Sequence, residues 1–143
     1  MYILDTCILN ILFFYPGAKR EAVTRELNTV DRSDVYISAI SVYELIGGAI
    51  SEINRTLNSR DVVLNLAALT KLIDKLSNFR VLQFTEEDYR RFEAISAAIK
   101  RRGSLDARIA ASALSRNYVV VTEDDEVFEL AGARHIDWTR PPT

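Results

Sequence analysis

The chain has 143 residues, of which 48% are hydrophobic, and its formal net charge is −2. This length and composition indicate one folded domain with a core of its own, and they exclude a disordered chain. The small net charge excludes a globally basic surface, so any contact with nucleic acid must depend on local basic patches or on bound cations.

Cysteine and histidine are scarce, with Cys7 and His135 the only examples of each. An internal disulfide and a zinc site of the Cys/His type within one chain are therefore excluded. Because His135 is the only histidine, a structural role is favoured for it over a catalytic one. No segment is typical of a signal peptide or a membrane span, and we expect a cytoplasmic protein with no membrane partner.

Apolar periods and helix breakers predict strands that alternate with helices along the chain. The expected strands are residues 2–4, 35–37, 80–84 and 118–121, with a short end strand at 133–136. The expected helices are residues 6–14, 18–27, 41–50, 60–76, 86–101 and 106–116, with a polar loop at 51–59. The segment Thr85–Asp88 is a capping signal for the helix at 86–101. This order predicts a single domain over residues 1–143, an α/β three-layer sandwich with a mainly parallel central sheet flanked by helices.

Acidic residues fall where such a sheet places its ligands, at the carboxyl ends of the strands. Asp5 directly follows the first predicted strand, and Asp124 follows the strand that ends at Val121. Asp5 and Asp106 also head apolar stripes, which places each carboxylate on the core-facing side of a helix start. An ionised carboxylate in that position needs a cation, a capping interaction or a raised pKa.

Each acid also has a purely structural interpretation. Asp5 and Asp106 suit helix N-caps, and Asp124 suits a turn. Glu44 suits a capping box that begins at Ser41, and the periodicity of its helix places it opposite the apolar stripe. Singly, the residues favour the structural role for Glu44 and Asp124 and leave Asp5 and Asp106 open. Together, clustered acids repel one another, and hard divalent cations relieve that repulsion and promote phosphodiester displacement.

Four segments, in order along the chain, resemble the motifs of the PIN-domain family. They are Ile3–Leu9, Ile40–Leu45, Asp106–Ala113 and Val120–Asp124 with Phe128, and the ending Ile136–Trp138 is similar too. The first resembles an apolar strand followed by Asp-Thr-Asn, and the third resembles an Asp that opens an alanine-rich helix. The chain departs from the pattern at Cys7, where the family usually has Asn, and at Val127, where an acid often precedes Phe128.

The resemblance implies a metal-dependent endoribonuclease that hydrolyses RNA phosphodiester bonds. The implied catalytic and metal-holding residues are Asp5, Glu44, Asp106 and Asp124, with Thr6 and Thr122 in support and Mg²⁺ or Mn²⁺ as cofactor. The subgroup that the chain resembles is the VapC-type toxin of type II toxin–antitoxin pairs, commonly a homodimer inhibited by a small antitoxin protein. Whether Asp125 assists or replaces Asp124 stays open.

Basic residues near the third motif are candidate RNA contacts. Lys100, Arg101 and Arg102 precede Asp106, and Arg108 follows it. Contact with phosphates is the functional interpretation, and for the first three residues favourable pairing with a helix C-terminus is the favoured alternative. A stripe on the helix at residues 60–76 is typical of core and can also serve as a partner surface.

Two other functions are compatible with parts of the pattern. An aspartate-nucleophile phosphatase would use Asp5, but that chemistry needs Asp-x-Asp and Cys7 occupies the second position. A non-catalytic PIN-like RNA- or protein-binding module usually loses acids of the quartet, and this sequence has all four.

Overall fold

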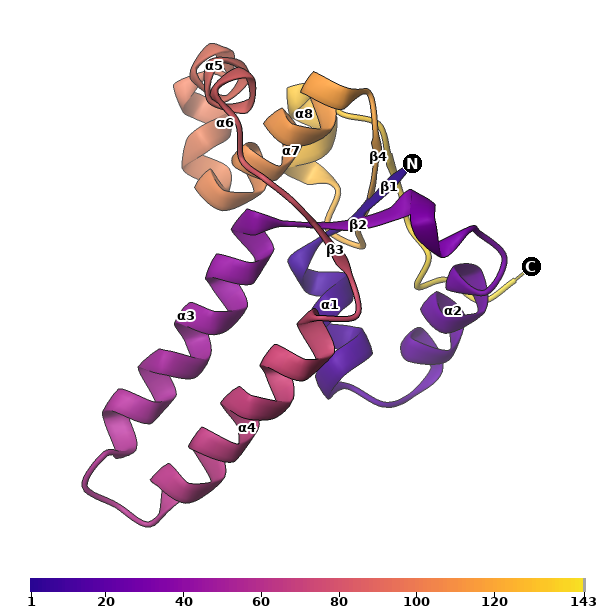
Figure 1. Ribbon diagram of the computed structural model, residues 1–143. Helices are drawn as coiled ribbons and strands as arrows, with labels where there is room; N and C mark the ends of the chain where they lie inside the picture. Colours follow the sequence, from indigo (N-terminus) through magenta and orange to yellow (C-terminus); the bar gives the residue numbers. More distant parts are fainter. Residues whose placement is uncertain (143) are drawn as a thin grey trace.

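The computed structural model describes residues 1–142 (Figure 1). The strands are β1 (Tyr2–Leu4), β2 (Val35–Ser38), β3 (Arg80–Leu82), β4 (Val119–Val121) and β5 (His135–Ile136). The helices are α1 (Thr6–Phe14), α2 (Ala18–Leu27), α3 (Ala39–Thr56), α4 (Asp61–Leu76), α5 (Glu86–Ala94), α6 (Ala97–Arg102), α7 (Ser104–Arg116) and α8 (Glu126–Ala131), with a 3-10 turn at Arg32–Asp34.

Within these residues the five strands form one parallel sheet in the order β3-β2-β1-β4-β5. Leu4 of the central strand β1 pairs with Ile37 of β2 on one side and with Val121 of β4 on the other. The chain leaves β1 toward β2 and later enters β4 on the opposite side, so the order reverses at the β1–β4 boundary. Such a reversal opens a crevice at the carboxyl ends of the strands.

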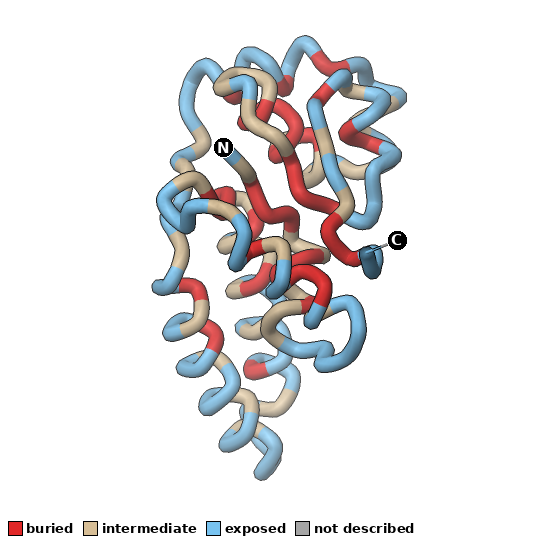
Figure 2. The backbone as a smooth tube through the Cα atoms, turned by 90° about the vertical axis from the view of Figure 1, so that its right-hand side faces the viewer, coloured by how far each residue is buried: buried red, intermediate tan, exposed pale blue. Residues whose placement is uncertain are grey.

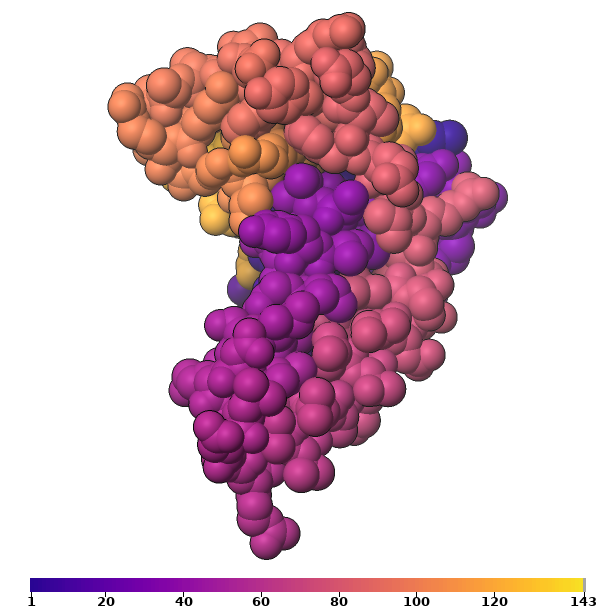
Figure 3. Space-filling view, turned by 60° about the vertical axis from the view of Figure 1, so that its left-hand side comes forward, coloured from indigo at the N-terminus to yellow at the C-terminus, as the bar shows by residue number. Residues whose placement is uncertain are grey.

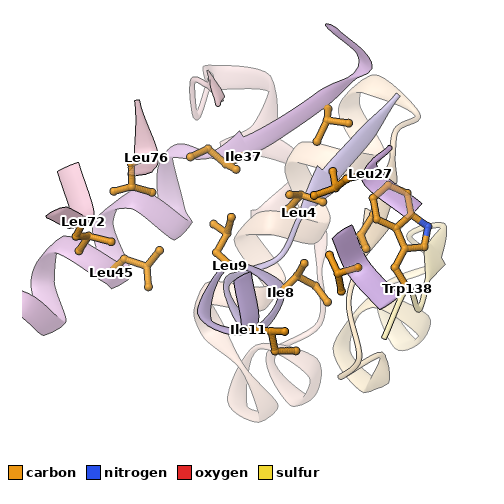
Figure 4. Packing of buried hydrophobic residues seen from close by; sticks show 13 residues of the cluster. Leu4, Ile8, Leu9, Ile11, Leu27, Ile37, Leu45, Leu72, Leu76 and Trp138 are labelled. Carbon is orange, nitrogen blue, oxygen red and sulfur yellow. The ribbon is translucent and has the colours of Figure 1, made fainter. Parts of the chain in front are cut away.

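The sheet separates two helical layers because side chains alternate between its faces. Leu4 and Val121 pack on one face with the helices α1 to α4, and Ile3 and Val120 pack on the other face with α7 and α8. Figure 4 shows the first of these clusters, which includes Leu4 together with residues of α1, α3 and α4. The buried segments in Figure 2 accordingly run through the strands and the helix faces beside them. The predicted three-layer α/β sandwich is confirmed.

Helices α3 and α4 form an antiparallel arm that extends beyond the sheet (Figures 1 and 3). The predicted loop at 51–59 is wrong, since α3 continues to Thr56 and buries Ile53. Its polar residues are helical because they lie on the exposed side of the arm, and Asn65 of α4 donates to Thr56 Oγ1 at 2.9 Å. None of the described helices is long and apolar enough to cross a membrane.

The apolar stripe predicted on α4 is also partly wrong. The helix buries Leu72 and Leu76, whereas Leu66 and Ile73 are about half exposed. The periodicity located the helix correctly, but α4 is covered on one side only, chiefly by α3, which leaves apolar side chains on its outer face in solvent.

The helix predicted at 86–101 is two helices. Thr85 and Asp88 form the predicted capping box of α5, but Ile95 is extended and Ser96 caps a new helix, α6, by accepting from Ile99 N. Sequence reasoning also missed α8, which is only six residues long, and placed the end of β3 two residues too late. The break at Ile95–Ser96 turns the chain so that Gly103 and α7 reach the carboxyl edge of the sheet.

Candidate metal centre

Asp5 lies at the end of β1 with only 3% of its surface exposed. It is the N-cap of α1, and its Oδ1 accepts from Thr6 N at 2.7 Å. Its Oδ2 accepts from Thr122 Oγ1 at 2.9 Å and from Cys7 Sγ at 3.3 Å. Burial raises the pKa of Asp5, and these hydrogen bonds oppose the rise. The residue is therefore a helix cap, as one interpretation predicted, whose second oxygen is held at the sheet edge.

Glu44 faces the same edge from the second turn of α3. The predicted capping box at Ser41 does not form, because α3 begins two residues earlier and Ser38 caps it by accepting from Ile40 N at 3.0 Å. Thr6 Oγ1 lies 2.9 Å from both Glu44 Oε1 and Ser41 Oγ. A hydroxyl carries one proton, so Thr6 donates to the carboxylate and accepts from Ser41. The half-buried Glu44 is thus joined to Asp5's own helix.

Asp106 enters from the opposite helical layer. It is the third residue of α7 and not its N-cap, which is Gly103, so the predicted capping role for Asp106 is wrong. A Cβ at Gly103 would lie 3.1 Å from Asp106 Oδ2 and 3.3 Å from Val127 Cγ2. Glycine at this position therefore lets the chain pass close to the carboxylate. A helix N-terminus favours a negative charge in its first turn, but it leaves the rest of the charge uncompensated.

Asp124 is an exposed residue of the loop after β4. Its backbone N–H donates to Thr122 Oγ1 at 3.0 Å, and that hydroxyl in turn donates to Asp5 Oδ2. Thr122 thus connects the Asp124 loop to the buried carboxylate, and its supporting role in a metal site stays a prediction. Its neighbour Asp125 is oriented differently, with Oδ2 3.9 Å from His135 Nε2.

The charges of the four acids act on one another. The pKa of Asp106 is raised to about 7 by burial and then by the charges of Asp5, Glu44 and Asp124. Burial and a neighbouring acid also raise the pKa of Glu44. Within residues 1–142, none of these four carboxylates forms an ion pair with a basic side chain. The structure therefore brings the predicted quartet together as an oxygen-rich, uncompensated negative cluster, the donor set that hard divalent cations such as Mg²⁺ and Mn²⁺ prefer.

The carboxylates of the four acids lie farther apart than the ligands around one bound ion would. In the described part of the chain, the one set of three acidic, histidine or cysteine side chains whose candidate ligand atoms all lie within 4.8 Å is Asp125, Glu129 and His135. Like charges separate where nothing neutralises them, which accounts for an open arrangement of the four acids.

Cys7 occupies the position at which the sequence departs from the family pattern. Burial and the charge of Asp5 raise the pKa of its thiol to about 12, so the group stays protonated. Its Sγ donates to Asp5 Oδ2 and lies 3.4 Å from Thr122 Oγ1. The thiol therefore supplies a weak donor to the buried carboxylate. Ser41, by contrast, was missed as a site residue, although its i,i+3 spacing from Glu44 places both on one helix face.

The basic candidates lie on the surface of α6 and α7. Lys100 Nζ and Arg108 Cζ lie 4.5 and 4.1 Å from the centre of the Phe92 ring. Arg102 forms an ion pair with Glu126 of α8, whereas Arg101 is exposed. The favoured structural interpretation fits in part, since three basic residues occupy the last turn of α6. Contact of these residues with RNA stays a prediction.

A groove of about 380 Å³ adjoins the acidic cluster and runs between α1, α3 and α4. Thr6 and Glu44 line the end that belongs to the cluster, and apolar side chains such as Phe14, Leu45 and Leu72 line much of the rest. Three further polar residues also line the groove, namely Asn10, Glu52 and Asn65. Sequence reasoning did not locate it, because a groove depends on how the arm is set against α1.

The fold and the cluster together define an α/β sandwich with four acidic side chains at the switch point of a parallel sheet. The chain belongs to the PIN domain family, whose model matches residues 2–133. This membership confirms the resemblance found in the sequence motifs.

Solved structures agree in fold. FitAcB from Neisseria gonorrhoeae is 26% identical with a TM-score of 0.74, over 96% of this chain and 98% of that one. DNA-bound VapBC from Salmonella typhimurium is 31% identical with a TM-score of 0.66, over 96% and 97%. A toxin–antitoxin complex from Klebsiella pneumoniae is 20% identical with a TM-score of 0.61, over 90% of each chain, and supports the fold alone. A comparison with curated proteins gave no match.

Proposed function

We propose that the chain is a metal-dependent endoribonuclease and the toxin of a type II toxin–antitoxin pair. The observation that carries this proposal is the meeting of Asp5, Glu44, Asp106 and Asp124 without a basic partner among residues 1–142. A cluster of this kind costs stability unless a cation is bound. Membership of the PIN domain family, and similarity to VapBC at 31% identity, support the nuclease and toxin assignments.

Each member of the quartet has a defined task in this proposal. Asp5 and Asp106, on opposite helical layers, would hold Mg²⁺ or Mn²⁺ between them, with Glu44 and Asp124 completing an oxygen donor set. A bound ion would activate a water molecule and stabilise the charge on the phosphodiester during in-line displacement. Thr122 and the Thr6 backbone orient Asp5.

The Thr6 hydroxyl has a separate task, since it orients Glu44 across the gap between α1 and α3. A side chain whose rotamer is held by a hydrogen bond loses less entropy when it binds an ion, which makes the geometry reproducible. Asp124 needs no such orientation because its backbone is already tied to Thr122.

The RNA substrate would approach over the surface of α6 and α7. Arg101 is the exposed basic residue of that surface whose side chain is free for a phosphate, and Lys100 and Arg108 would contribute from beside Phe92. Such contacts position the backbone of a nucleic acid and carry no sequence information. They suit a net charge of −2 because they are local.

A small antitoxin protein would occupy the apolar groove beside the cluster. VapBC, as a solved complex, offers the precedent of a toxin held by its partner. The groove has an apolar floor for an amphipathic segment, and it ends at Thr6 and Glu44, so an occupant would cover two residues of the site. This arrangement would couple antitoxin binding to inhibition.

A homodimer would use the arm. Val63, Leu64, Leu66 and Ile73 of α4 are each about half exposed or more, which is a large apolar surface for a chain of this size. Such a surface marks an interaction site. We propose a dimer that acts in the cytoplasm.

The test is cleavage of RNA by antitoxin-free protein. Cleavage of single-stranded or loop RNA should require added Mg²⁺ or Mn²⁺ and should stop in EDTA, and Asp5→Asn should abolish it. Undiminished cleavage in EDTA would overturn the metal mechanism. RNA binding without cleavage under all metal conditions would instead identify a binding module, and a stable aspartyl-phosphate on Asp5 would identify a phosphatase.

A further inference from the structure

A second group of candidate ligands lies on the outer side of the Asp124 loop. Asp125 precedes α8, Glu129 follows one turn later on the same helix face, and His135 lies at the start of the edge strand β5. One ligand atom from each lies within 4.8 Å of the other two. From the sequence, His135 favours a structural role and Asp125 is an open alternative to Asp124, so neither is explained by the quartet.

The imidazole of His135 is oriented as a ligand would be. Its Nδ1 lies 3.1 Å from the Ala133 carbonyl oxygen, which can only accept, so Nδ1 carries the proton. The other ring nitrogen, Nε2, faces Asp125 Oδ2 at 3.9 Å. At that distance the two atoms form no hydrogen bond, so Nε2 is left open. A backbone carbonyl on one ring nitrogen with the other left open is the arrangement that holds metal-binding histidines.

Within residues 1–142, no lysine or arginine forms an ion pair with Asp125 or Glu129, although Arg102 lines the same surface hollow as these two acids. Glu126, on the adjacent face of α8, pairs with Arg102, and Arg134 is hydrogen-bonded to Asn117. Asp125 is 60% exposed, so its carboxylate can rotate toward the imidazole at little cost. Two carboxylates and one imidazole therefore converge at a place where the guanidinium of Arg102 is already paired with Glu126.

We propose that Asp125, Glu129 and His135 form a site for a borderline divalent transition cation such as Zn²⁺, separate from the oxygen-only quartet. Zn²⁺ binds imidazole nitrogen and carboxylate oxygen at about 2.0–2.2 Å, which places ligand atoms roughly 3.3–3.5 Å apart in a tetrahedron. The observed separations require a small contraction by two exposed side chains. Three protein ligands leave the fourth position to water. This proposal does not rest on the nuclease assignment.

The choice of ion follows from the donor set. Imidazole selects zinc-like ions over Mg²⁺, which prefers oxygen ligands in octahedral geometry. The chain has one histidine and one cysteine, so a zinc site of the Cys/His type stays excluded. A site made of one histidine with Asp and Glu is the type that a single histidine permits. A bound ion would join α8 to β5 and stabilise the folded chain by mass action.

The single histidine makes the test direct, because an untagged protein gives one set of imidazole signals. In the full chain at about pH 7.5, where an ordinary imidazole is neutral, ¹⁵N-detected spectra should show Nδ1–H in the free protein. Added Zn²⁺ should shift Nε2, and added Mg²⁺ should not. Imidazole signals that Zn²⁺ leaves unchanged would overturn the proposal without any substitution.

Calorimetry on the Asp106→Asn background assigns the ligands, since that change weakens the quartet. Zn²⁺ should bind at one equivalent, and His135→Gln or Glu129→Gln should each weaken binding about tenfold or more. Glu126→Gln is the matched control, an exposed acid of the same helix outside the group, and should bind as the background does. Equal affinity in all four proteins would place the zinc elsewhere and refute the site.

Discussion

Replacement of Asp106 by Asn separates a metal ligand from an ordinary helix acid. The change keeps the shape of the side chain and removes its charge. The pKa of Asp106 is raised from 3.8 to about 7 in the folded chain. Three pKa units correspond to about 4 kcal/mol, and because the carboxylate is partly exposed, solvent screening reduces the expected effect to about 1–2 kcal/mol.

The sign of the pH dependence follows from the direction of the shift. Between about pH 4 and pH 7 the folded chain holds this proton and the unfolded chain does not, so the contribution of Asp106 to stability is lost as the pH rises through that interval. In EDTA, Asp106→Asn should therefore match wild type near pH 4 and exceed it near pH 8. At about 4 °C per kcal/mol, the gain in Tm is about 4–8 °C.

Two measurements complete the test of Asp106. Thermal unfolding followed by circular dichroism, with and without Mg²⁺ or Mn²⁺, should show a metal-induced rise in Tm for wild type and a much smaller rise for Asp106→Asn. RNA cleavage should fall by orders of magnitude. A fully active variant with an unchanged metal-induced rise in Tm would refute the assignment of this residue. A difference in Tm between Asp106→Asn and wild type that does not vary with pH would refute the electrostatic argument.

Three further predictions concern the support of the site, the RNA surface and the arm. Thr122→Val should lower the free energy of unfolding by about 1–3 kcal/mol and reduce cleavage, because it removes the hydroxyl that donates to buried Asp5. Thr122→Ser keeps a hydroxyl and should restore both stability and cleavage. Denaturant titration and cleavage rates measure the two effects. Arg101→Ala should weaken RNA binding and reduce the salt dependence of log K by about 0.7, whereas Arg25→Ala on α2 should not; equal slopes would contradict the proposed contact. Light scattering at micromolar concentration should show a dimer, and Leu64→Glu should yield a folded monomer whose Tm does not depend on protein concentration; a monomeric wild type would exclude the dimer.

The layer architecture could be predicted because its signals are local. The strand at 118–121 is almost wholly apolar, as a strand buried on both faces must be, and the capping pattern at Thr85 marked the true start of α5. The quartet could be proposed because parallel strands end at one edge, which brings Asp5 and Asp124 together whatever the helices do.

The errors arose where tertiary contacts override periodicity. Ser41 and Glu44 have the spacing of a capping box, but Ser38, which ends β2, caps α3 first, and this releases Glu44 to meet Thr6. Asp106 looked like a cap because Gly103 gives no side-chain signal for a helix start. Residues 51–59 looked like a loop because they are mostly polar. A two-helix arm exposes most of its surface, so polar residues there reflect contact with solvent and do not mark the end of a helix.

The groove along the arm can be tested with two adjacent glycines of α3. Gly48 lines the groove and Gly47 does not, and a Cβ at either position would meet no atom within 4 Å. Both are helical, so leucine at either should leave the fold at least as stable, since glycine in a helix interior costs roughly 0.5–1 kcal/mol relative to alanine. The two variants therefore differ in one property, the filling of the groove.

Gly48→Leu should weaken binding of the antitoxin proposed as the partner of this chain, and Gly47→Leu should not. A side chain forced into a packed interface costs about 1–3 kcal/mol, which is a loss of affinity of roughly 5- to 150-fold. Fluorescence anisotropy with labelled antitoxin, on the Asp106→Asn background to avoid toxicity, measures the difference. Equal wild-type affinity in both variants would show that the antitoxin docks elsewhere, and an equal loss in both would show that leucine disturbs α3 itself. Only the asymmetric result connects the groove, which ends at Thr6 and Glu44, to control of the acidic cluster.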